Sequence, residues 1–479
     1  MRVNTLSLFA ILGMALTTRG NVHSKPVETF DYAIEEGIVY RAAVLEYRAY
    51  DDMAEGGLAV LRENARVFVE YAEAAKQQGA DILVFPEYGL TGSTADTLGD
   101  VMSKTQALPD PGAGTVLCNS TDTSDAIEVC FDILYGGPGT SNVVERGVTD
   151  VIMSSYWVDE LPFLTAPQMW QSWSEGLAVN LVVANFHSPE DGALGSGIFR
   201  GLTSQESLYT YDPNGGTKLL VGEVVSRGAT PLRTSTGRYD DATTPEGTTG
   251  VGSDVTVNQS SSQAVPVREE VALGVHQEAS WIPTDDGDVE AEERNAQPEA
   301  EGREILTGWF FLHEDLGRYS NHALERGDGV MERSLCHNDS LCCSVTYSFP
   351  ADPTDESSFL LLAYSGVAEK GDGAYSLFTQ VCAVVYCLNE NVTSCARIEE
   401  NGAPQKTSFR AHNLTGDFDT PYIYPSVFTQ ELELVDISLW DFESSVSSEK
   451  MVTSTLVLHE ELDYLLSLRL FGRWFDRDP

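Results

Sequence analysis

Short apolar runs alternate with segments of helical periodicity through the first half of the chain. Residues 40–46, with the apolar stretch Ala-Ala-Val-Leu at their centre, predict a first strand, and residues 82–86 form an apolar run that ends in a proline. Between them, apolar side chains recur every three or four positions, which is typical of an amphipathic helix: Leu58, Leu61, Ala65, Phe68, Ala72 and Ala75. Gly79 follows, where a glycine commonly ends a helix. The order predicts a parallel βαβ unit.

The same alternation continues to about residue 225. Apolar runs predict strands over three ranges, 127–130, 150–154 and 180–185. Helices are expected over 141–146 and 167–177. Residues 209–220 are expected to form a hairpin that turns at Asn214-Gly215. Residues 92–126 show no strand pattern and no amphipathic helix. The pattern predicts an α/β domain.

Composition changes after residue 225. Residues 226–303 contain few large apolar side chains, and residues 284–304 hold nine acidic residues and two arginines. This favours an acidic low-complexity linker, and an acidic binding tail is the alternative. Strand-like runs then predict a β-rich second domain: 309–312, 359–364, 377–386 and 465–471.

The charge balance excludes some partners. The chain of 479 residues has 29 basic and 73 acidic side chains, a formal charge of −44. Such a surface repels nucleic acid phosphates and anionic lipid, so neither is expected as a partner.

The first residues resemble an export signal. Arg2 precedes the apolar stretch 6–16, so residues 1–20 are expected to be a signal peptide. No later stretch approaches the roughly 20 apolar residues of a membrane span, and the C-terminus has no apolar tail for a lipid anchor. A secreted extracellular protein is expected. N-glycosylation sequons agree with export: Asn119, Asn258, Asn338, Asn391 and Asn413.

Six of the eight cysteines lie late in the chain. In an oxidising compartment they are expected to form three disulfides of undetermined pairing. A zinc site is the weaker alternative, because no C-x-x-C pair accompanies them. The six are Cys336, Cys342, Cys343, Cys382, Cys387 and Cys395.

Two reactive side chains follow apolar runs. Glu87 comes directly after residues 82–86, and Cys130 ends the run that begins at Ile127. On neighbouring strand ends, a carboxylate and a thiol make a base and a nucleophile. The simpler interpretations are a helix-capping carboxylate for Glu87, and for Cys130 a buried small side chain or a disulfide with Cys118.

Several motifs resemble the vanin and biotinidase branch of the nitrilase superfamily. They are Phe-Pro-Glu at 85–87, Cys-Phe-Asp-Ile-Leu at 130–134, Ser-Tyr-Trp-Val-Asp-Glu-Leu-Pro at 155–162, Gly-Ser-Gly-Ile-Phe at 195–199 and the cysteine blocks at 335–343 and 380–387. The resemblance implies an incomplete αββα sandwich over residues 38–225, and a vanin-type β-rich domain over residues 304–479.

The resemblance also implies a reaction. Members of the vanin and biotinidase branch hydrolyse linear amides, such as pantetheine or biotinyl amides, without a metal or organic cofactor. By the family pattern Glu87 is the general base, Cys130 is the nucleophile that forms a thioester, and the Phe131 N–H is an oxyanion donor. The expected partner is a small-molecule amide.

One family feature is missing from the sequence. A lysine in a basic and aromatic stretch is expected between Glu87 and Cys130, but the only lysine there is Lys104, in an unrelated context. The resemblance implies that on the order of 90 residues of the family pattern are absent at this point, more than half of a typical domain. Lys104 and Arg146 are the candidate replacement cations. The alternatives to an active amidase are an impaired secreted pseudoenzyme and a truncated gene product.

Four further side chains near these motifs are expected to be structural. Asp132 is interpreted as a structural carboxylate and His187 as a loop or core histidine. Trp157 and Trp173 are expected in the core, and lining of the substrate pocket is the alternative.

Overall fold

The structure is a computed structural model that describes residues 37–94, 97–104, 125–226, 309–352, 355–398, 404–446 and 451–479. The predicted signal peptide, nearly all of the predicted linker and the sequons at Asn119 and Asn258 lie outside these residues. The domain boundaries drawn from the sequence stay predictions.

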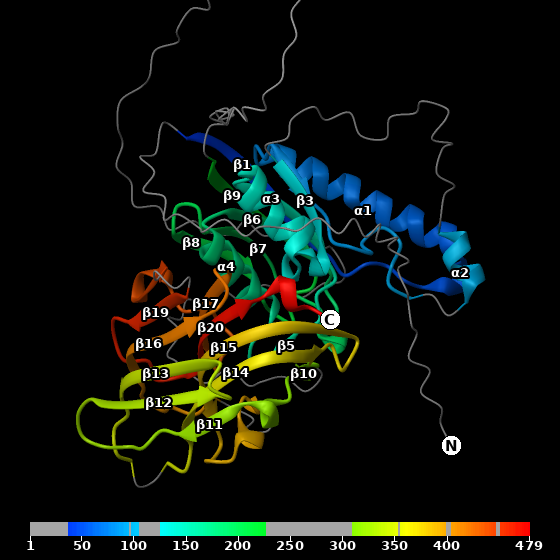
Figure 1. The fold of residues 1–479 in the computed structure, drawn as a ribbon. Helices are drawn as coiled ribbons and strands as arrows, with labels where there is room; N and C mark the ends of the chain where they lie inside the picture. Colours follow the sequence, from blue (N-terminus) through cyan, green and yellow to red (C-terminus); the bar gives the residue numbers. More distant parts are fainter. Residues whose placement is uncertain are drawn as a thin grey trace, which may run out of the picture. The chain divides into compact units, whose positions relative to one another are not determined.

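The first sheet contains the predicted βαβ unit. Its strand order is β2-β1-β9, with β1 at Ile38–Glu46, β2 at Ile82–Val84 and β9 at Lys218–Ser226. Strand β1 pairs with β2 in parallel and with β9 antiparallel. Helix α1 (Gly57–Gln77) connects β1 to β2, as predicted. Figure 1 shows it lying along this sheet.

The buried face of α1 differs from the predicted one. Leu58, Ala65 and Ala72 are exposed, whereas the helix buries Gly57, Val60, Asn64, Tyr71 and Ala75. The apolar pattern was misleading because Asn64, a polar residue, lies fully buried in the middle of that face. The true stripe is therefore displaced from the one that apolar spacing alone indicates.

The second sheet has five strands in the order β3-β4-β6-β7-β8. They are β3 (Asp125–Val129), β4 (Asp150–Ser155), β6 (Asn180–Asn185), β7 (Ser196–Arg200) and β8 (Gln205–Thr210). Strands β3, β4 and β6 run parallel. Helices α3 (Ser141–Arg146) and α4 (Ala166–Leu177) occupy the predicted connections.

The predicted hairpin over residues 209–220 is wrong. Strand β8 pairs with β7 in the second sheet, and β9 pairs with β1 in the first. The Asp212–Gly215 turn, closed by Gly215 N–H to the Asp212 carbonyl at 2.9 Å, therefore carries the chain between sheets. A turn sequence fixes a change of direction but not which strands pair.

Residues 92–126 contain a helix that the sequence interpretation missed. Helix α2 covers Leu98–Ser103. The Thr97 hydroxyl accepts from the Asp100 N–H, and the Asp100 carboxylate accepts from the Thr97 N–H at 2.8 Å. This capping box begins a helix too short to show apolar periodicity.

The two sheets pack against each other between helices. Strand β1 contacts β6 and β7 of the second sheet, and α4 covers the other side of β6 and β7. On the first sheet, Tyr71 and Ala75 of α1 pack on Ala43 and Leu45 of β1. The described part therefore has the helix, sheet, sheet, helix order of an αββα sandwich.

The C-terminal part is β-rich, as predicted. One sheet has the order β11-β14-β15-β20-β17 and the other the order β12-β13-β16-β19-β18. The strands are β11 (Ser320–Ala323), β12 (Met331–His337), β13 (Leu341–Ser348), β14 (Ser358–Lys370), β15 (Tyr375–Cys387), β16 (Arg410–Phe418), β17 (Ile423–Thr429), β18 (Trp440–Val446), β19 (Val452–Leu458) and β20 (Leu465–Arg473).

The predicted strand at residues 309–312 is mostly wrong. Only Leu312 belongs to a strand, the two-residue β10 (Leu312–His313), which pairs with β5 (Glu160–Leu161). The aromatic run 309–311 instead packs by its side chains, with the Trp309 and Phe311 rings 4.8 Å apart.

The six late cysteines form three disulfides. The pairs are Cys336–Cys342, Cys343–Cys382 and Cys387–Cys395. Cys343 on β13 and Cys382 on β15 join the two C-terminal sheets, whereas the other two pairs each close a short loop.

Helix α4 joins the α/β part to the C-terminal part. It contacts β7 on one side and β17 on the other, and the buried residues of both parts form one continuous cluster. The fully buried Arg469 of β20 donates to the Phe163 carbonyl and to the Ser172 hydroxyl, the latter at 3.0 Å. The two parts therefore share a core.

Because α4 packs closely against β17, we expect Gly176→Ala to destabilise the protein. A Cβ at Gly176 would lie 2.5 Å from the Ile423 carbonyl oxygen of β17. Overpacking of this kind lowers the free energy of unfolding by about 1–3 kcal/mol, measured by denaturant unfolding. Gly99→Ala in α2 is the control, since its nearest neighbour would be the Thr97 hydroxyl at 3.4 Å. Equal stability of Gly176→Ala and wild type would contradict close packing here.

Candidate active site

Cys130 stands at a sharp turn at the end of β3. It begins the 3-10 segment Cys130–Leu134, and its φ of 47° places it in the left-handed region. Non-glycine residues in this region are concentrated at functional sites. The Asp132 carboxylate accepts from the Val129 N–H at 2.8 Å, which is the structural role expected for Asp132. The strand end and this cap fix the direction of the thiol.

Glu87 approaches Cys130 from the other sheet. It follows β2 of the first sheet, and its carboxyl group is in hydrogen-bonding contact with the Cys130 thiol. The Ser154 hydroxyl of β4 donates to the Phe85 carbonyl at 2.8 Å, tying the two sheets together beside the pair. The expectation of neighbouring strand ends was therefore wrong. The two groups meet because the sheets face each other.

Burial sets the ionisation of both groups. It raises the pKa of the Glu87 carboxyl, and the nearby Asp132 charge raises it further. Burial first and the Glu87 charge second raise the pKa of Cys130 to about 12. The thiol is thus protonated at neutral pH, beside a carboxyl that can accept its proton.

Aromatic rings surround the pair on two sides. Tyr88 and Tyr156 pack edge to face, with ring centroids 5.6 Å apart. On the other side the Phe131 ring contacts Trp157 at 5.2 Å and Tyr375 at 5.1 Å. Cys130 is only 9% exposed. The thiol is therefore largely shielded from water.

The Phe131 N–H belongs to the first turn of the 3-10 segment. Amide groups at the beginning of a helical segment have no acceptor within it. Its position next to the thiol suits an oxyanion donor, a role that stays a prediction.

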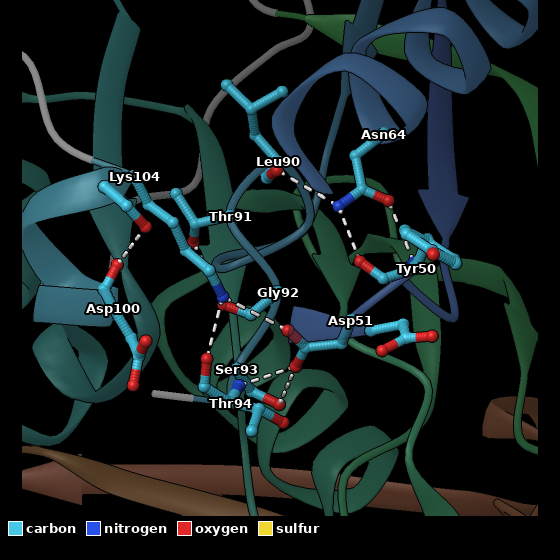
Figure 2. Close-up of polar contacts among 12 residues, drawn as sticks. Tyr50, Asp51, Asn64, Leu90, Thr91, Gly92, Ser93, Thr94, Asp100 and Lys104 are labelled. Atoms are coloured by element: carbon cyan, nitrogen blue, oxygen red, sulfur yellow. Dashed lines mark hydrogen bonds and ion pairs between the residues drawn. The ribbon is translucent and has the colours of Figure 1, made fainter. Parts of the chain in front are cut away.

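Lys104 has a structural contact rather than a place beside the thiol. Its side chain is 5% exposed, and its ammonium contacts the Asp51 carboxylate at 3.2 Å and the Thr94 carbonyl at 2.7 Å. Asp51 also accepts from the Thr94 N–H at 2.5 Å (Figure 2). Lys104 and Asp51 thus hold the end of the loop that begins at Glu87.

Asn64 fixes the same loop from α1, and the sequence interpretation missed it. Its amide donates to the Leu90 carbonyl at 3.1 Å and the Tyr50 carbonyl at 2.9 Å (Figure 2). Its oxygen accepts from the Tyr47 hydroxyl at 2.7 Å. The only signal in the sequence is a polar residue beside an apolar helix face.

Neither candidate replacement for the family lysine lies beside the pair, since Lys104 is bound to Asp51. Arg146 is exposed at the end of α3. In the part of the chain that the structure describes, the groups that shift the pKa of Glu87 are Cys130, the Tyr156 backbone and Asp132, none of them cationic.

The other singled-out residues are buried. His187 is 1% exposed and its Nδ1 lies 2.8 Å from the Glu46 carboxylate. Trp157 and Trp173 lie in the main core cluster. All three positions agree with their expected structural roles.

Three predicted sequons lie within the described residues. Asn338 and Asn391 are exposed in turns, and the Asn413 side chain accepts from the Thr346 N–H at 3.2 Å. Glycosylation stays a prediction at all of them.

The described segments lack both a metal-binding cluster and a membrane-spanning helix. They hold no group of three or more His, Cys, Asp or Glu side chains arranged to bind a metal ion. None of their helices is long and apolar enough to span a membrane.

Comparison with known proteins finds a domain family and several relatives that this chain resembles. Residues 310–478 match the family model for the vanin C-terminal domain. The pantetheine hydrolase VNN2 of Homo sapiens is 26% identical over 353 residues, which are 74% of this chain and 54% of that protein. The biotinidase of Bos taurus is 27% identical over 354 residues, 73% of this chain and 57% of that protein. The chain spans about half the length of these relatives.

Solved structures give only a weak likeness. The match with an amidase from Nesterenkonia sp. covers 40% of this chain and 92% of the amidase chain, with 15% sequence identity and a TM-score of 0.28. That overlap is too low to support an argument, so the assignment depends on the sequence relatives and the domain match. The vanin C-terminal domain match and the sequence relatives support the assignment of this chain to the vanin and biotinidase branch of the nitrilase superfamily.

Proposed function

We propose that this protein cleaves linear amides by acyl transfer to Cys130, with Glu87 as general base. The observation that carries the proposal is the contact between the Glu87 carboxyl and the Cys130 thiol across two packed sheets. The names of the relatives support the reaction class, because they are pantetheine hydrolases and biotinidases. Pantetheine and biotinyl amides are therefore the substrates proposed, and a secreted location is proposed with them.

The reaction has two halves. In the first, Glu87 takes the Cys130 proton, the sulfur attacks the amide carbonyl carbon, and the C–N bond breaks as the proton passes from Glu87 to the leaving amine. In the second, Glu87 takes a proton from water, whose oxygen attacks the thioester carbonyl. The C–S bond breaks, the acid leaves, and Cys130 regains its proton. The Phe131 N–H would donate to the carbonyl oxygen in both halves.

The proposed enzyme is slow. Loss of one donor to the oxyanion commonly lowers the rate by about 10²–10³, and the described residues offer no ammonium in place of the family lysine. A second candidate function is binding of the same amides without turnover. The pKa of about 12 favours it, because the thiolate is scarce at neutral pH.

The first prediction concerns hydrolysis. The purified chain is expected to release amine from pantetheine or a biotinyl amide slowly, and to carry a thioester adduct on Cys130 that intact mass spectrometry detects. Cys130→Ala is expected to abolish both signals. Glu87→Gln is expected to lower the rate by about 10²–10⁴, the usual contribution of a general base.

Each alternative outcome has a meaning. Equal hydrolysis by wild type and Cys130→Ala would overturn the proposal. Substrate binding by wild type with neither adduct nor hydrolysis would establish the second candidate instead.

The second prediction concerns pH. Because the pKa of Cys130 is raised to about 12, its alkylation by iodoacetamide is expected to rise about tenfold per pH unit from about pH 7 to 10, without the plateau of an ordinary thiol of pKa about 8.5. A Cys118→Ser background removes the other cysteine outside the three disulfides.

The same shift has a stability consequence of defined sign. A thiol whose folded pKa is raised stabilises the fold below its unfolded pKa, and this contribution falls as pH rises toward the folded value. For the alkylation experiment, the urea-unfolded chain serves as control. Its alkylation rate is expected to level off above the ordinary thiol pKa of about 8.5. A folded-state plateau at that same pH would contradict the burial of Cys130.

A further inference from the structure

The β14–β15 hairpin of the C-terminal part reaches the candidate active site. Its loop, residues 371–374, leads directly into Tyr375 at the beginning of β15. The Tyr375 ring lies 5.1 Å from the Phe131 ring, centroid to centroid, at an interplanar angle of 44°. Phe131 is the residue after Cys130. A side chain far along the sequence therefore contacts the segment that holds the thiol.

We propose that Tyr375 is a specificity-determining residue whose ring forms one wall of the acyl pocket at Cys130. The active site is then shared between the α/β part and the C-terminal part. This inference rests on the proposed function, because it assigns a substrate contact to the same thiol.

Buried charges hold the hairpin in place. The Lys370 side chain is fully buried, and its ammonium contacts the Glu314 carboxylate and, at 3.6 Å, the Glu160 carboxylate. Glu160 also accepts from the Gly371 N–H at 3.0 Å. A buried ammonium strongly favours keeping its carboxylate partners. Since Glu160 belongs to β5 of the α/β part, these contacts fix the hairpin relative to the strand segment beside Trp157.

The loop conformation directs the ring. Gly371, Asp372 and Gly373 have φ values of +60°, +54° and +82°, so the backbone of three successive residues lies in the left-handed region. A Cβ on Gly371 would lie 2.9 Å from Cε1 of Tyr375. Glycine at this position thus lets the Tyr375 ring fold back toward Phe131.

The charges around the ring indicate which acyl groups fit. Two acidic side chains lie at the thiol, Glu87 and Asp132, and no cation is among the groups that act on Glu87 in the described residues. Tyr375 is near Cys130 and near Glu160, whose charge the Lys370 ammonium balances. Burial raises the pKa of Tyr375 well above its ordinary value, so the phenol stays neutral. An anionic acyl chain would be repelled, whereas a neutral chain packs against the rings. The substrate class is amides with a neutral acyl chain.

The test uses alkylation of Cys130, which requires no turnover. Iodoacetamide and N-benzyl iodoacetamide carry the same reacting carbon but differ in bulk, so the ratio of their rate constants reports space and not thiol pKa. The rates are measured by intact mass spectrometry on the full chain with Cys118→Ser. Tyr375→Ala is expected to raise the ratio of bulky to small reagent by about tenfold.

Matched variants make the result specific. Tyr375→Phe keeps the ring and is expected to leave the ratio unchanged, and Tyr375→Trp is expected to lower it. Tyr464→Ala, at a partly buried tyrosine of the same C-terminal part, is the control and is expected to have no effect. If Tyr375→Ala fails to fold, the Trp variant still tests the sign. Iodoacetate is expected to react more slowly than iodoacetamide in every variant.

An unchanged ratio in both Tyr375→Ala and Tyr375→Trp would overturn the inference. So would an equal increase in Tyr464→Ala, since that would indicate general loosening. The proposed function is tested separately, by hydrolysis and by the adduct on Cys130. Absence of both would contradict the proposed function, and the alkylation ratio would still report whether Tyr375 borders the thiol.

Discussion

The face-to-face packing of two sheets is the constraint on which the candidate site depends. Glu87 comes from the first sheet and Cys130 from the second, so their contact exists only while β1 lies against β6 and β7. Loop anchors maintain the approach. Asn64 of α1 and the Asp51–Lys104 pair hold the loop that follows Glu87. Stability and chemistry therefore share the same interface.

The C-terminal β-rich part belongs to the same structural unit as the catalytic pair. Helix α4 lies between the second sheet and β17, and the fully buried Arg469 and Lys370 make polar contacts to the α/β part. Buried polar contacts need good geometry, so they favour one arrangement of the two parts. This arrangement also brings Tyr375 to Phe131. The C-terminal part thus acts both as a scaffold and, by our inference, as a pocket wall.

Local structure could be predicted from the sequence, and long-range pairing could not. Helix α3 and strand β6 have the predicted bounds because periodicity and turn residues act within a few positions. The hairpin at 209–220 failed because strand pairing depends on distant partners. Glu87 and Cys130 could be named from motifs, but Tyr375 lies hundreds of residues away with no local signal. Asn64 was missed because a buried polar residue looks like a surface one in sequence.

The central claim is that the Glu87 carboxyl and the Cys130 thiol are coupled in the folded protein. The most direct measurement is the titration of Cys130 followed by NMR of ¹³C-labelled cysteine, comparing Cys118→Ser with Cys118→Ser/Glu87→Gln. Since the Glu87 charge raises the pKa of Cys130, its removal is predicted to shift the titration to lower pH. An identical titration in both proteins would mean that the two groups are not in contact, and would contradict the account.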